Sequence, residues 1–267
     1  ATWDVDAAQK GGYEHFMLKE IYEQPASIKT TITPRITEGM PDFSECGLTD
    51  ERLAAYRKIF IVACGTAMHA GMVGKYVIEK LARTEVTVDI ASEFRYRDPL
   101  IDEHTLFIAI SQSGETLDTL AALREAKRKG ARVLSVVNVV GSSVARESDD
   151  VFYTWAGPEI AVASTKAYTT QLMCMYLLAL HMGQVKGTID DKYFETIMSQ
   201  LKALPAKLER VLEQEGHIAQ IAEKIYRNNN VFFIGRGMDA SIAYEGSLKL
   251  KEISYINSFA MAAGELK

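Results

Sequence analysis

The sequence lacks the features that mark several large classes of proteins. It has no lysine- or arginine-rich run, and its net charge is -5, so it offers no basic surface to a nucleic acid or an anionic membrane. Its longest apolar run, Leu172 to Leu180, is too short to span a membrane, and its first residues lack the charged-then-apolar order of a signal peptide. We therefore predict a soluble, cytoplasmic protein whose partner is a small molecule, with no nucleic acid and no membrane.

Cysteine is scarce as well. Cys46, Cys64 and Cys174 are widely spaced, odd in number and without a C-x-x-C pair, which argues against a disulfide framework and against a zinc site. The phosphate-binding signatures G-x-x-x-x-G-K-[ST] and G-x-G-x-x-G are also absent, which weakens any nucleotide-binding hypothesis. We expect reduced thiols, no metal and no cofactor.

The remaining composition is that of a globular protein. With 267 residues, of which 48% are hydrophobic, the chain is long enough for one large domain or two domains of ordinary size. Residues 1–13 are polar and glycine-containing, which is typical of a linker, and residues up to 58 indicate a helical arm outside the core, interrupted at Pro25. The first residue is not methionine, so we interpret the chain as a fragment.

From residue 59 onward, short apolar runs alternate with helical patterns. We expect strands at 59–63, 86–90, 106–110, 132–137 and 151–155, with helices between them and a long helix at 164–182. This alternation predicts an α/β fold, a parallel sheet with helices on both faces. Ligands of such sheets bind outside the carboxyl ends of the strands.

The first strand pattern recurs further along the chain. Ile59-Phe-Ile-Val-Ala-Cys-Gly-Thr and Val231-Phe-Phe-Ile-Gly-Arg-Gly-Met are apolar strands closing on a glycine, 172 residues apart. The same offset relates Ala91-Ser-Glu-Phe-Arg to Ala263-Gly-Glu-Leu-Lys. We interpret this as an internal duplication. The predicted regions are a linker and helical arm at 1–58, a first domain at 59–183, a helical connection at 184–230 and an incomplete second copy at 231–267.

The stretch from Leu106 to Thr119 is the centre of the functional hypothesis. Its apolar run suits a buried parallel strand, and Thr116 opens a helical pattern. The residues between are small or neutral and polar, namely Ser111, Gln112, Ser113, Gly114 and Thr116. Backbone N–H groups at the start of the helix and the flanking hydroxyls form a cradle for a phosphate dianion, which needs no lysine or arginine.

A simpler interpretation is that Ser113 only caps the following helix, as serines at strand-to-helix junctions commonly do. One cap does not require three hydroxyls and a glutamine within six residues, however. The density of polar groups therefore favours binding of a phosphate or a sugar phosphate.

A second candidate group lies near the carboxyl terminus. An apolar stripe at helical spacing comprises Ile242, Gly246, Ile253 and Ile256. Glu245, Lys249 and Glu252 border it. In one interpretation Glu245 and Lys249 form an ion pair on a solvated face, worth about 0.3 kcal/mol. Since they follow a second glycine-terminated strand, they can instead lie at a ligand site, where a carboxylate serves proton transfer.

Several longer motifs carry a resemblance to a known family. They are CGT at 64–66, ASEFRYRD at 91–98, SQSGET at 111–116, GSS at 141–143, EIAVASTKAYTTQL at 159–172, EGSLKLKEISYI at 245–256 and AAGELK at 262–267. Together they resemble the isomerase part of the glucosamine-6-phosphate synthases, the isomerising glutamine:fructose-6-phosphate aminotransferases. That part consists of two sugar-isomerase (SIS) domains, so the resemblance implies a duplicated SIS fold.

The resemblance also implies roles for individual residues. A phosphate is implied to bind Ser111, Gln112, Ser113 and Thr116. The sugar is implied to contact Thr66, Val162 and Ser164. Glu252 is implied to shuttle a proton between C1 and C2 during ketose-to-aldose conversion, while Lys249 stabilises the enediolate.

The implied partners are fructose 6-phosphate, glucose 6-phosphate and glucosamine 6-phosphate, a second copy in a homodimer, and an amino-terminal glutaminase domain that supplies ammonia. Ala67 departs from the pattern, since many members have serine there. The histidine that follows GELK in the family and its Schiff-base lysine do not occur in this sequence. We therefore expect that the chain as given does not make glucosamine 6-phosphate.

Two other interpretations stay open. A SIS module that only senses a sugar phosphate needs the cradle but not Glu252, and the presence of both the cradle and the Lys249 and Glu252 pair favours the enzyme. A related SIS deaminase or deglycase is disfavoured by the carboxyl-terminal motifs.

Overall fold

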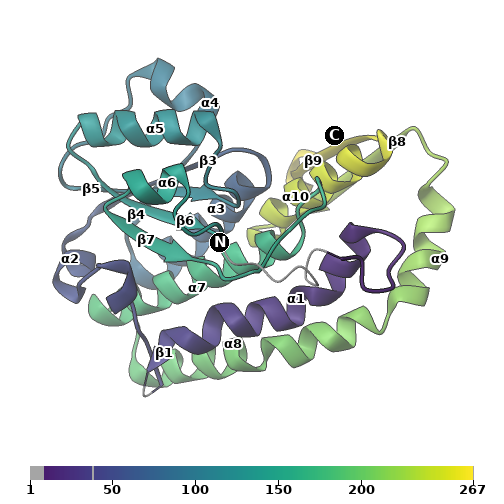
Figure 1. The fold of residues 1–267 in the computed structure, drawn as a ribbon, viewed down its shortest axis with the longest axis horizontal. Coiled ribbons are helices and arrows are strands. Elements are labelled where there is room, and N and C mark those ends of the chain that lie inside the picture. The colour runs from purple at the N-terminus through teal and green to yellow at the C-terminus, as the bar shows by residue number, and fades with distance from the viewer. Residues whose placement is uncertain (1–8, 38, 267) are drawn as a thin grey trace.

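The structure, a computed structural model, describes residues 9–37 and 39–266, so most of the predicted linker lies outside the described residues. At its centre is a sheet of five parallel strands in the order β4-β3-β5-β6-β7 (Figure 1). The strands are β3 Lys58–Ala63, β4 Glu85–Ile90, β5 Thr105–Ser111, β6 Arg132–Val137 and β7 Asp150–Tyr153. The predicted α/β class is confirmed, and each of the five expected strands is present within two residues of its predicted ends.

Helices cover both faces of this sheet. One face packs against α3 (Gly65–Ala82) and α7 (Lys166–Val185), and the other against α4 (Ala91–Phe94), α5 (Leu117–Arg128) and α6 (Ser143–Glu147). Alternate side chains of one strand enter the two cores, so that Ile59 and Ile61 join the first and Phe60 and Val62 the second. Because both faces of the strand are covered, its sequence is an unbroken apolar run.

The amino-terminal segment corrects the expectation of an arm outside the core. Helix α1 (Phe16–Ile32) runs through Pro25 without a break, and Ile28 and Ile32 are only 2% and 3% exposed. After it come η2 (Thr33–Arg35), β1 (Ile36–Thr37), β2 (Met40–Pro41), η3 (Ser44–Cys46) and α2 (Asp50–Ala55). Phe43 and Leu53 of this stretch are buried in the same core. The expectation is wrong because α1 packs its few apolar side chains against α7.

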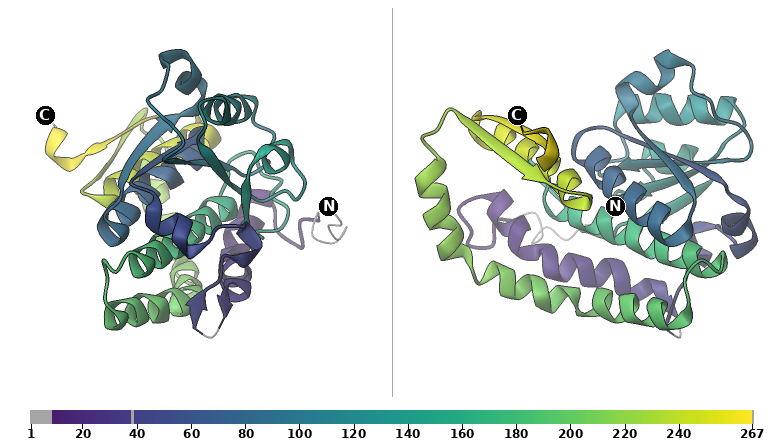
Figure 2. Two further views of the ribbon diagram at one scale, coloured as in Figure 1. Left: turned by 90° about the vertical axis from the view of Figure 1, so that its left-hand side faces the viewer. Right: turned by 180° about the vertical axis from the view of Figure 1, so that it is seen from behind.

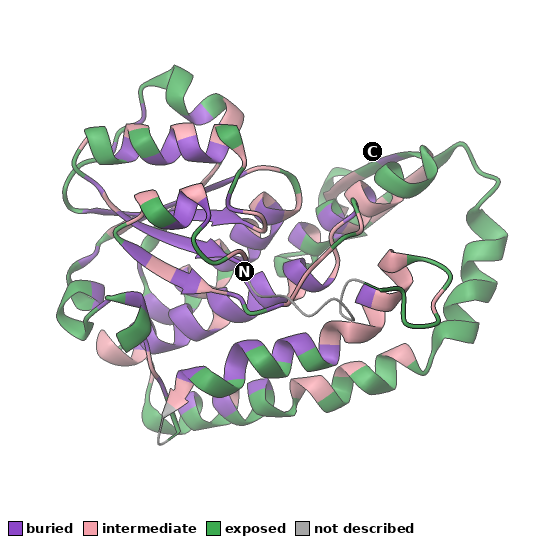
Figure 3. Cartoon of the chain, viewed as in Figure 1, coloured by how far each residue is buried: buried purple, intermediate pink, exposed green. Residues whose placement is uncertain are grey.

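Two helices form the connection predicted at 184–230. Helix α8 (Asp191–Leu212) runs through Pro205 and lies alongside α1 (Figures 1 and 2). Helix α9 (Glu215–Ile225) buries none of its residues and is exposed along its length (Figure 3). No helix in residues 9–37 or 39–266 combines the length and apolar character that crossing a bilayer requires.

The carboxyl-terminal residues form a second β-α-β unit, β8 (Asn230–Gly235), α10 (Met238–Ser254) and β9 (Asn257–Ala262). The parallel pairing of β8 with β9 starts at Asn230↔Asn257, and that of β3 with β4 starts at Lys58↔Glu85, so the register repeats at the offset of 172. The first unit is followed by α4 and then by the 3-10 turn η4 (Arg95–Arg97), whereas β9 is followed directly by the 3-10 turn η5 (Ala263–Glu265), which stands where the first unit has α4. The duplication is therefore present in the backbone, whereas the domain boundaries stay a prediction.

The buried face of α10 differs from the expected stripe. Ile242 and Ile253 of that stripe are 40% and 56% exposed. The buried residues are instead Ser241, Ala243, Glu245 and Ser247. Small or polar side chains lie inward because α10 packs against α3 on one side and against β8 and β9 on the other. The isoleucine periodicity therefore predicted the wrong buried face, since Ile242 and Ile253 are exposed among the described residues.

Candidate functional site

The seven residues predicted to bind substrate line one cavity. It lies at the carboxyl ends of β3 and β5, where parallel sheets bind ligands, and its volume is about 230 Å³. These residues are Thr66, Ser111, Gln112, Ser113, Thr116, Val162 and Ser164. The rest of the lining consists of Cys64, Ala67, Ile110, Thr119, Glu159, Ala161 and Gln171. Three segments that are far apart in the sequence therefore meet at one edge of the sheet.

The SQSGET loop, residues 111–116, joins β5 to α5. Ser111 Oγ accepts a hydrogen bond from Gly114 N at 3.0 Å and lies 3.1 Å from Thr116 Oγ1. Thr116, not Ser113, is the N-cap residue of α5, and it makes no side-chain cap hydrogen bond. Ser113 Oγ instead accepts from Glu115 N at 3.2 Å. The interpretation of Ser113 as a simple helix cap is therefore wrong, and no capping side chain competes with a ligand for the first N–H groups of α5.

The GSS turn at 141–143 and the start of α6 hold this loop in place. Val144 N donates to Gly114 O at 2.9 Å, and Ser143 N donates to the Glu115 carboxylate at 2.8 Å. Hydrogen bonds from Ser143 hold the pKa of Glu115 below its usual value. Gly114 has a φ of 66°, and a Cβ at this position would overlap Ser142, so the loop requires glycine here.

The sugar-side residues Val162 and Ser164 belong to an irregular stretch, residues 154–165, which we call the β7–α7 segment. Within it, Ser164 Oγ donates to Glu159 Oε2 at 2.8 Å. Thr165 N and Ala167 N donate to Glu159 Oε1 at 2.8 and 3.1 Å, so this carboxylate satisfies the start of α7. Val162 is 98% exposed and stands at the rim of the cavity.

Helix α10 reaches the cavity through Thr66. Thr66 Oγ1 donates to Glu245 Oε1 at 3.0 Å and accepts from Lys249 Nζ at 2.9 Å. Lys249 Nζ also lies 2.5 Å from Glu252 Oε2 and 3.4 Å from Glu245 Oε1. Among the described residues, Lys249 and Glu252 do not line the cavity themselves, and they are joined to it by the Thr66 hydroxyl.

His69 is a member of this network that the sequence interpretation missed. Its Nδ1 lies 2.7 Å from Glu245 Oε2, and Glu245 is only 5% exposed. His69 stands three residues after Thr66 on α3, so both side chains lie on the same helical face. The T-x-x-H spacing indicates in the sequence that Thr66 and His69 share a helical face. The residues around them do not indicate that this face contacts Glu245.

The cavity floor also contains polar residues that were not predicted. Thr119 and Gln171 are buried, and Gln171 Oε1 has no hydrogen-bond partner within the described parts of the chain. Cys64 lies beside them, and burial raises the pKa of its thiol, so it stays protonated at neutral pH. Gln171 lies in the EIAVASTKAYTTQL motif, four residues after Ala167, and both residues are buried in α7. The sequence signal for Gln171 was this helical spacing within the motif.

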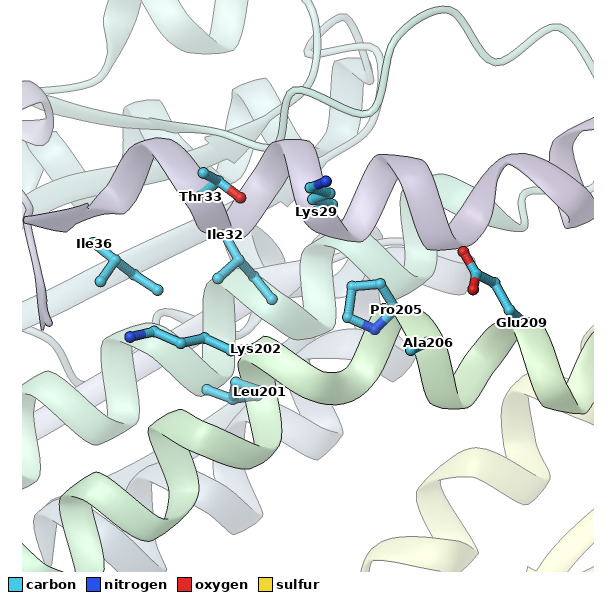
Figure 4. Close-up of a pocket in the computed structure, with 9 residues that line it drawn as sticks. All are labelled: Lys29, Ile32, Thr33, Ile36, Leu201, Lys202, Pro205, Ala206 and Glu209. Atoms are coloured by element: carbon cyan, nitrogen blue, oxygen red, sulfur yellow. The ribbon is translucent and has the colours of Figure 1, made fainter.

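A larger hollow lies between α1 and α8, with a volume of about 490 Å³ (Figure 4). Its lining is Lys29, Ile32, Thr33, Ile36, Leu201, Lys202, Pro205, Ala206 and Glu209. Thr33 is the one hydroxyl in this set, and the set contains no loop at a helix amino terminus. The smaller cavity at the sheet edge is therefore the better candidate for an anionic, hydroxyl-rich ligand.

Similarities to known proteins extend over most of the chain. The SIS domain family model matches residues 52–181. Over 267 residues the chain is 60% identical to the glutamine--fructose-6-phosphate aminotransferase [isomerizing] of Clostridium tetani, with all of this chain and 44% of that relative covered. The solved C-terminal domain of glucosamine-fructose-6-phosphate aminotransferase from Francisella tularensis has a TM-score of 0.92 and 44% identity, covering 97% of this chain and 72% of that one.

A more distant structure shares the fold alone. The glucosamine-6-phosphate deaminase of Thermotoga maritima has a TM-score of 0.70 at 21% identity, covering 94% of this chain and 71% of that one. The chain spans 44% of the length of the curated relative from Clostridium tetani. The cavity, the fold and these similarities lead to one conclusion. The chain belongs to the family formed by the C-terminal, SIS-domain parts of glucosamine-fructose-6-phosphate aminotransferases.

Proposed function

We propose that this chain is the isomerase part of a glutamine:fructose-6-phosphate aminotransferase and that it binds hexose 6-phosphates. In the complete protein, fructose 6-phosphate and glutamine-derived ammonia give glucosamine 6-phosphate, the entry point of hexosamine synthesis. One observation carries the proposal. A single cavity joins the SQSGET loop to the sugar-side residues and, through Thr66, to Lys249 and Glu252.

The cavity suits a phosphate dianion held by neutral donors. Ser111, Ser113 and Thr116 offer hydroxyls, and Gln112 offers an amide. Helix α5 begins directly after them at Leu117, and its dipole adds about 0.3–1 kcal/mol of favourable interaction with an anion. Among the described residues that line the cavity there is no lysine or arginine. Recognition of the phosphate therefore depends on hydrogen-bond geometry, which a sulfate or phosphate ion shares.

The Lys249 and Glu252 pair supplies the groups that isomerisation requires. In the open-chain ketose, the Glu252 carboxylate takes a proton from C1, and the electron pair of that C–H bond forms an enediolate. The protonated Glu252 then returns the proton to C2 while the hydroxyl proton moves from O1 to O2, which gives the aldose and restores the carboxylate. Lys249 stabilises the negative charge of the enediolate oxygens without taking the proton, and its contact with Thr66 directs it toward the cavity.

Calorimetric titration with glucose 6-phosphate tests the binding site. Replacing Ser113 and Thr116 together by alanine removes two donors from the SQSGET loop, so the affinity should fall by about tenfold, or roughly 1.4 kcal/mol. The matched control replaces Thr196 and Ser199, which are exposed on α8, and should leave the affinity unchanged. Equal affinities for the double variant and the parent chain would contradict the proposal.

We further propose a cytoplasmic homodimer that works with a glutaminase domain supplying ammonia. The names of the relatives, which include glutamine as a substrate, support the second part. Exposed apolar side chains on the second β-α-β unit, Phe232, Ile234 and Phe259, support association with another surface. Sedimentation velocity at micromolar concentration tests the dimer, and a monomer there would count against it.

A further inference from the structure

Helix α1 lies before residues 52–181, which match the SIS family model, and yet its side chains form hydrogen bonds with the β7–α7 segment. That segment carries Val162 and Ser164 into the cavity and contains neither helix nor strand. A long irregular segment keeps one conformation only if its backbone polar groups find partners elsewhere, because its own residues make no ladder. Many of those partners come from one face of α1.

The contacting side chains of α1 are Glu20, Glu23, Ser27 and Thr31, a spacing that places them along one side of the helix. At one end, Thr31 Oγ1 lies 2.5 Å from Thr154 O, and Ser27 Oγ donates to Ala156 O at 3.3 Å. At the other end, Glu23 pairs with the buried Lys166 at 2.6 Å, directly after the segment. Both ends of the segment are thus tied to the same helix.

Glu20 makes the contact that is nearest to the sugar-side residues. Its Oε1 accepts hydrogen bonds from Ile160 N at 2.6 Å and from Ala161 N at 3.1 Å, and Val162 follows at once. Glu20 is only 2% exposed, and burial raises its pKa while the two N–H groups act in the opposite direction. A buried carboxylate is unfavourable unless it is well bonded, so a position that only packed α1 against the core would favour an apolar residue.

We propose that Glu20 is a positioning residue for the sugar half of the substrate. By fixing the backbone at Ile160 and Ala161, it holds Val162 and Ser164 where they can meet the hexose. This inference rests on the proposed function of the cavity and extends its machinery to a helix outside the matched SIS region. The SQSGET loop is held instead by hydrogen bonds from Asn138, Ser143 and Val144, which are not among the hydrogen-bond partners of Glu20, so we expect the phosphate half of the ligand not to depend on Glu20.

Glucose 6-phosphate and inorganic phosphate distinguish the sugar half of the site from the phosphate half, because inorganic phosphate occupies only the latter. We expect Glu20→Ala to weaken glucose 6-phosphate binding by about tenfold, because the two hydrogen bonds to the carboxyl Oε1 are lost. Its affinity for inorganic phosphate should change by less than about twofold, since the SQSGET loop is untouched. Glu20→Gln should lie between, because its amide oxygen still accepts from both N–H groups. The control is Glu14→Gln, an exposed carboxyl just before α1.

Equal losses for the two ligands, or no loss for either, would overturn the positioning role. Amide hydrogen exchange at Ile160 and Ala161 gives a readout that needs no ligand. Exchange there should be about tenfold faster in Glu20→Ala, while amides in the middle of α7 stay protected. If the alanine variant does not fold, the glutamine variant carries the comparison. A parent chain that binds neither ligand would contradict the proposed function, whereas unchanged exchange would contradict the role of Glu20.

Discussion

The two β-α-β units share a backbone but use it differently. β3-α3-β4 and β8-α10-β9 have the same register, and Gly65 and Gly237 at the amino-terminal ends of their helices have φ of 55° and 57°. In the first unit, residues at the start of the helix line the cavity, with Thr66 among them. In the second unit the matching residue is Met238, which does not line it.

The second unit carries its charged groups on the body of its helix. Glu245 and Lys249 of α10 stand where α3 has Val73 and Val77, and the two helices pack against each other. Thr66 of one unit therefore meets Glu245 and Lys249 of the other. The two copies therefore contribute different parts of the candidate site. The first unit supplies the edge of the sheet that binds the ligand, and the second unit supplies the charged helix face beside it.

The largest effect should come from breaking the charged face of the second unit. Glu252→Gln removes the proposed base, so conversion of fructose 6-phosphate to glucose 6-phosphate by the complete protein should slow by about a hundredfold. Binding of glucose 6-phosphate should be largely retained. Glu245→Gln is the matched control and should slow the conversion less, because both carboxyl oxygens of Glu245 are already bonded, one to Thr66 and one to His69.

An unchanged rate in Glu252→Gln would show that the assignment of the base is wrong. A complete parent protein that binds glucose 6-phosphate tightly but does not isomerise fructose 6-phosphate would instead favour a module that only senses sugar phosphates. The rate at which the parent protein isomerises fructose 6-phosphate distinguishes the two outcomes. It is measurable in the first and absent in the second.

A smaller effect should come from a strand end at which the two units carry different residues. Gly235 ends β8 where the first unit has Ala63, and a Cβ on Gly235 would overlap the backbone of Asp239 at the start of α10. Gly235→Ala should therefore lower the free energy of unfolding by about 2 kcal/mol in urea titrations. The reverse change, Ala63→Gly, should cost about 1 kcal/mol, since it only loosens the strand. A larger loss for Ala63→Gly than for Gly235→Ala would contradict this difference.

The smallest effect concerns the SQSGET loop, which follows the sheet of the first unit. Hydrogen bonds from Ser143 lower the pKa of Glu115 from its ordinary value of 4.5 in the folded protein. The stability from this contact is therefore fully present above pH 4.5 and is lost as the pH falls through the lower folded value. Glu115→Gln should be less stable than the parent at pH 7 and equally stable in acid. A difference that stays constant from pH 7 to acid in urea titrations would contradict this.

Prediction from the sequence worked best where burial is complete on both sides. The strands of the main sheet and helix α5 were identified because an unbroken apolar run or a strong helical stripe has one structural explanation. It failed for α1 and for the inner face of α10. In α1 few apolar residues are needed, because Ser27 and Thr31 also bond to the β7–α7 segment. In α10 the buried face is polar, so hydrophobic periodicity gives no signal for it.

The strands of the sheet, the duplication and the polar composition of the SQSGET loop can be identified in the amino-acid sequence, since strand periodicity, an offset of 172 and clustered hydroxyls are properties of residue order. The contacts of Thr66 with Glu245 and of Glu20 with Ile160 are visible only in the folded protein. These partners are far apart in the chain. Their approach depends on how α3 crosses α10 and how α1 lies against the β7–α7 segment, and such packing geometry follows from the whole core and is not encoded in any one stretch.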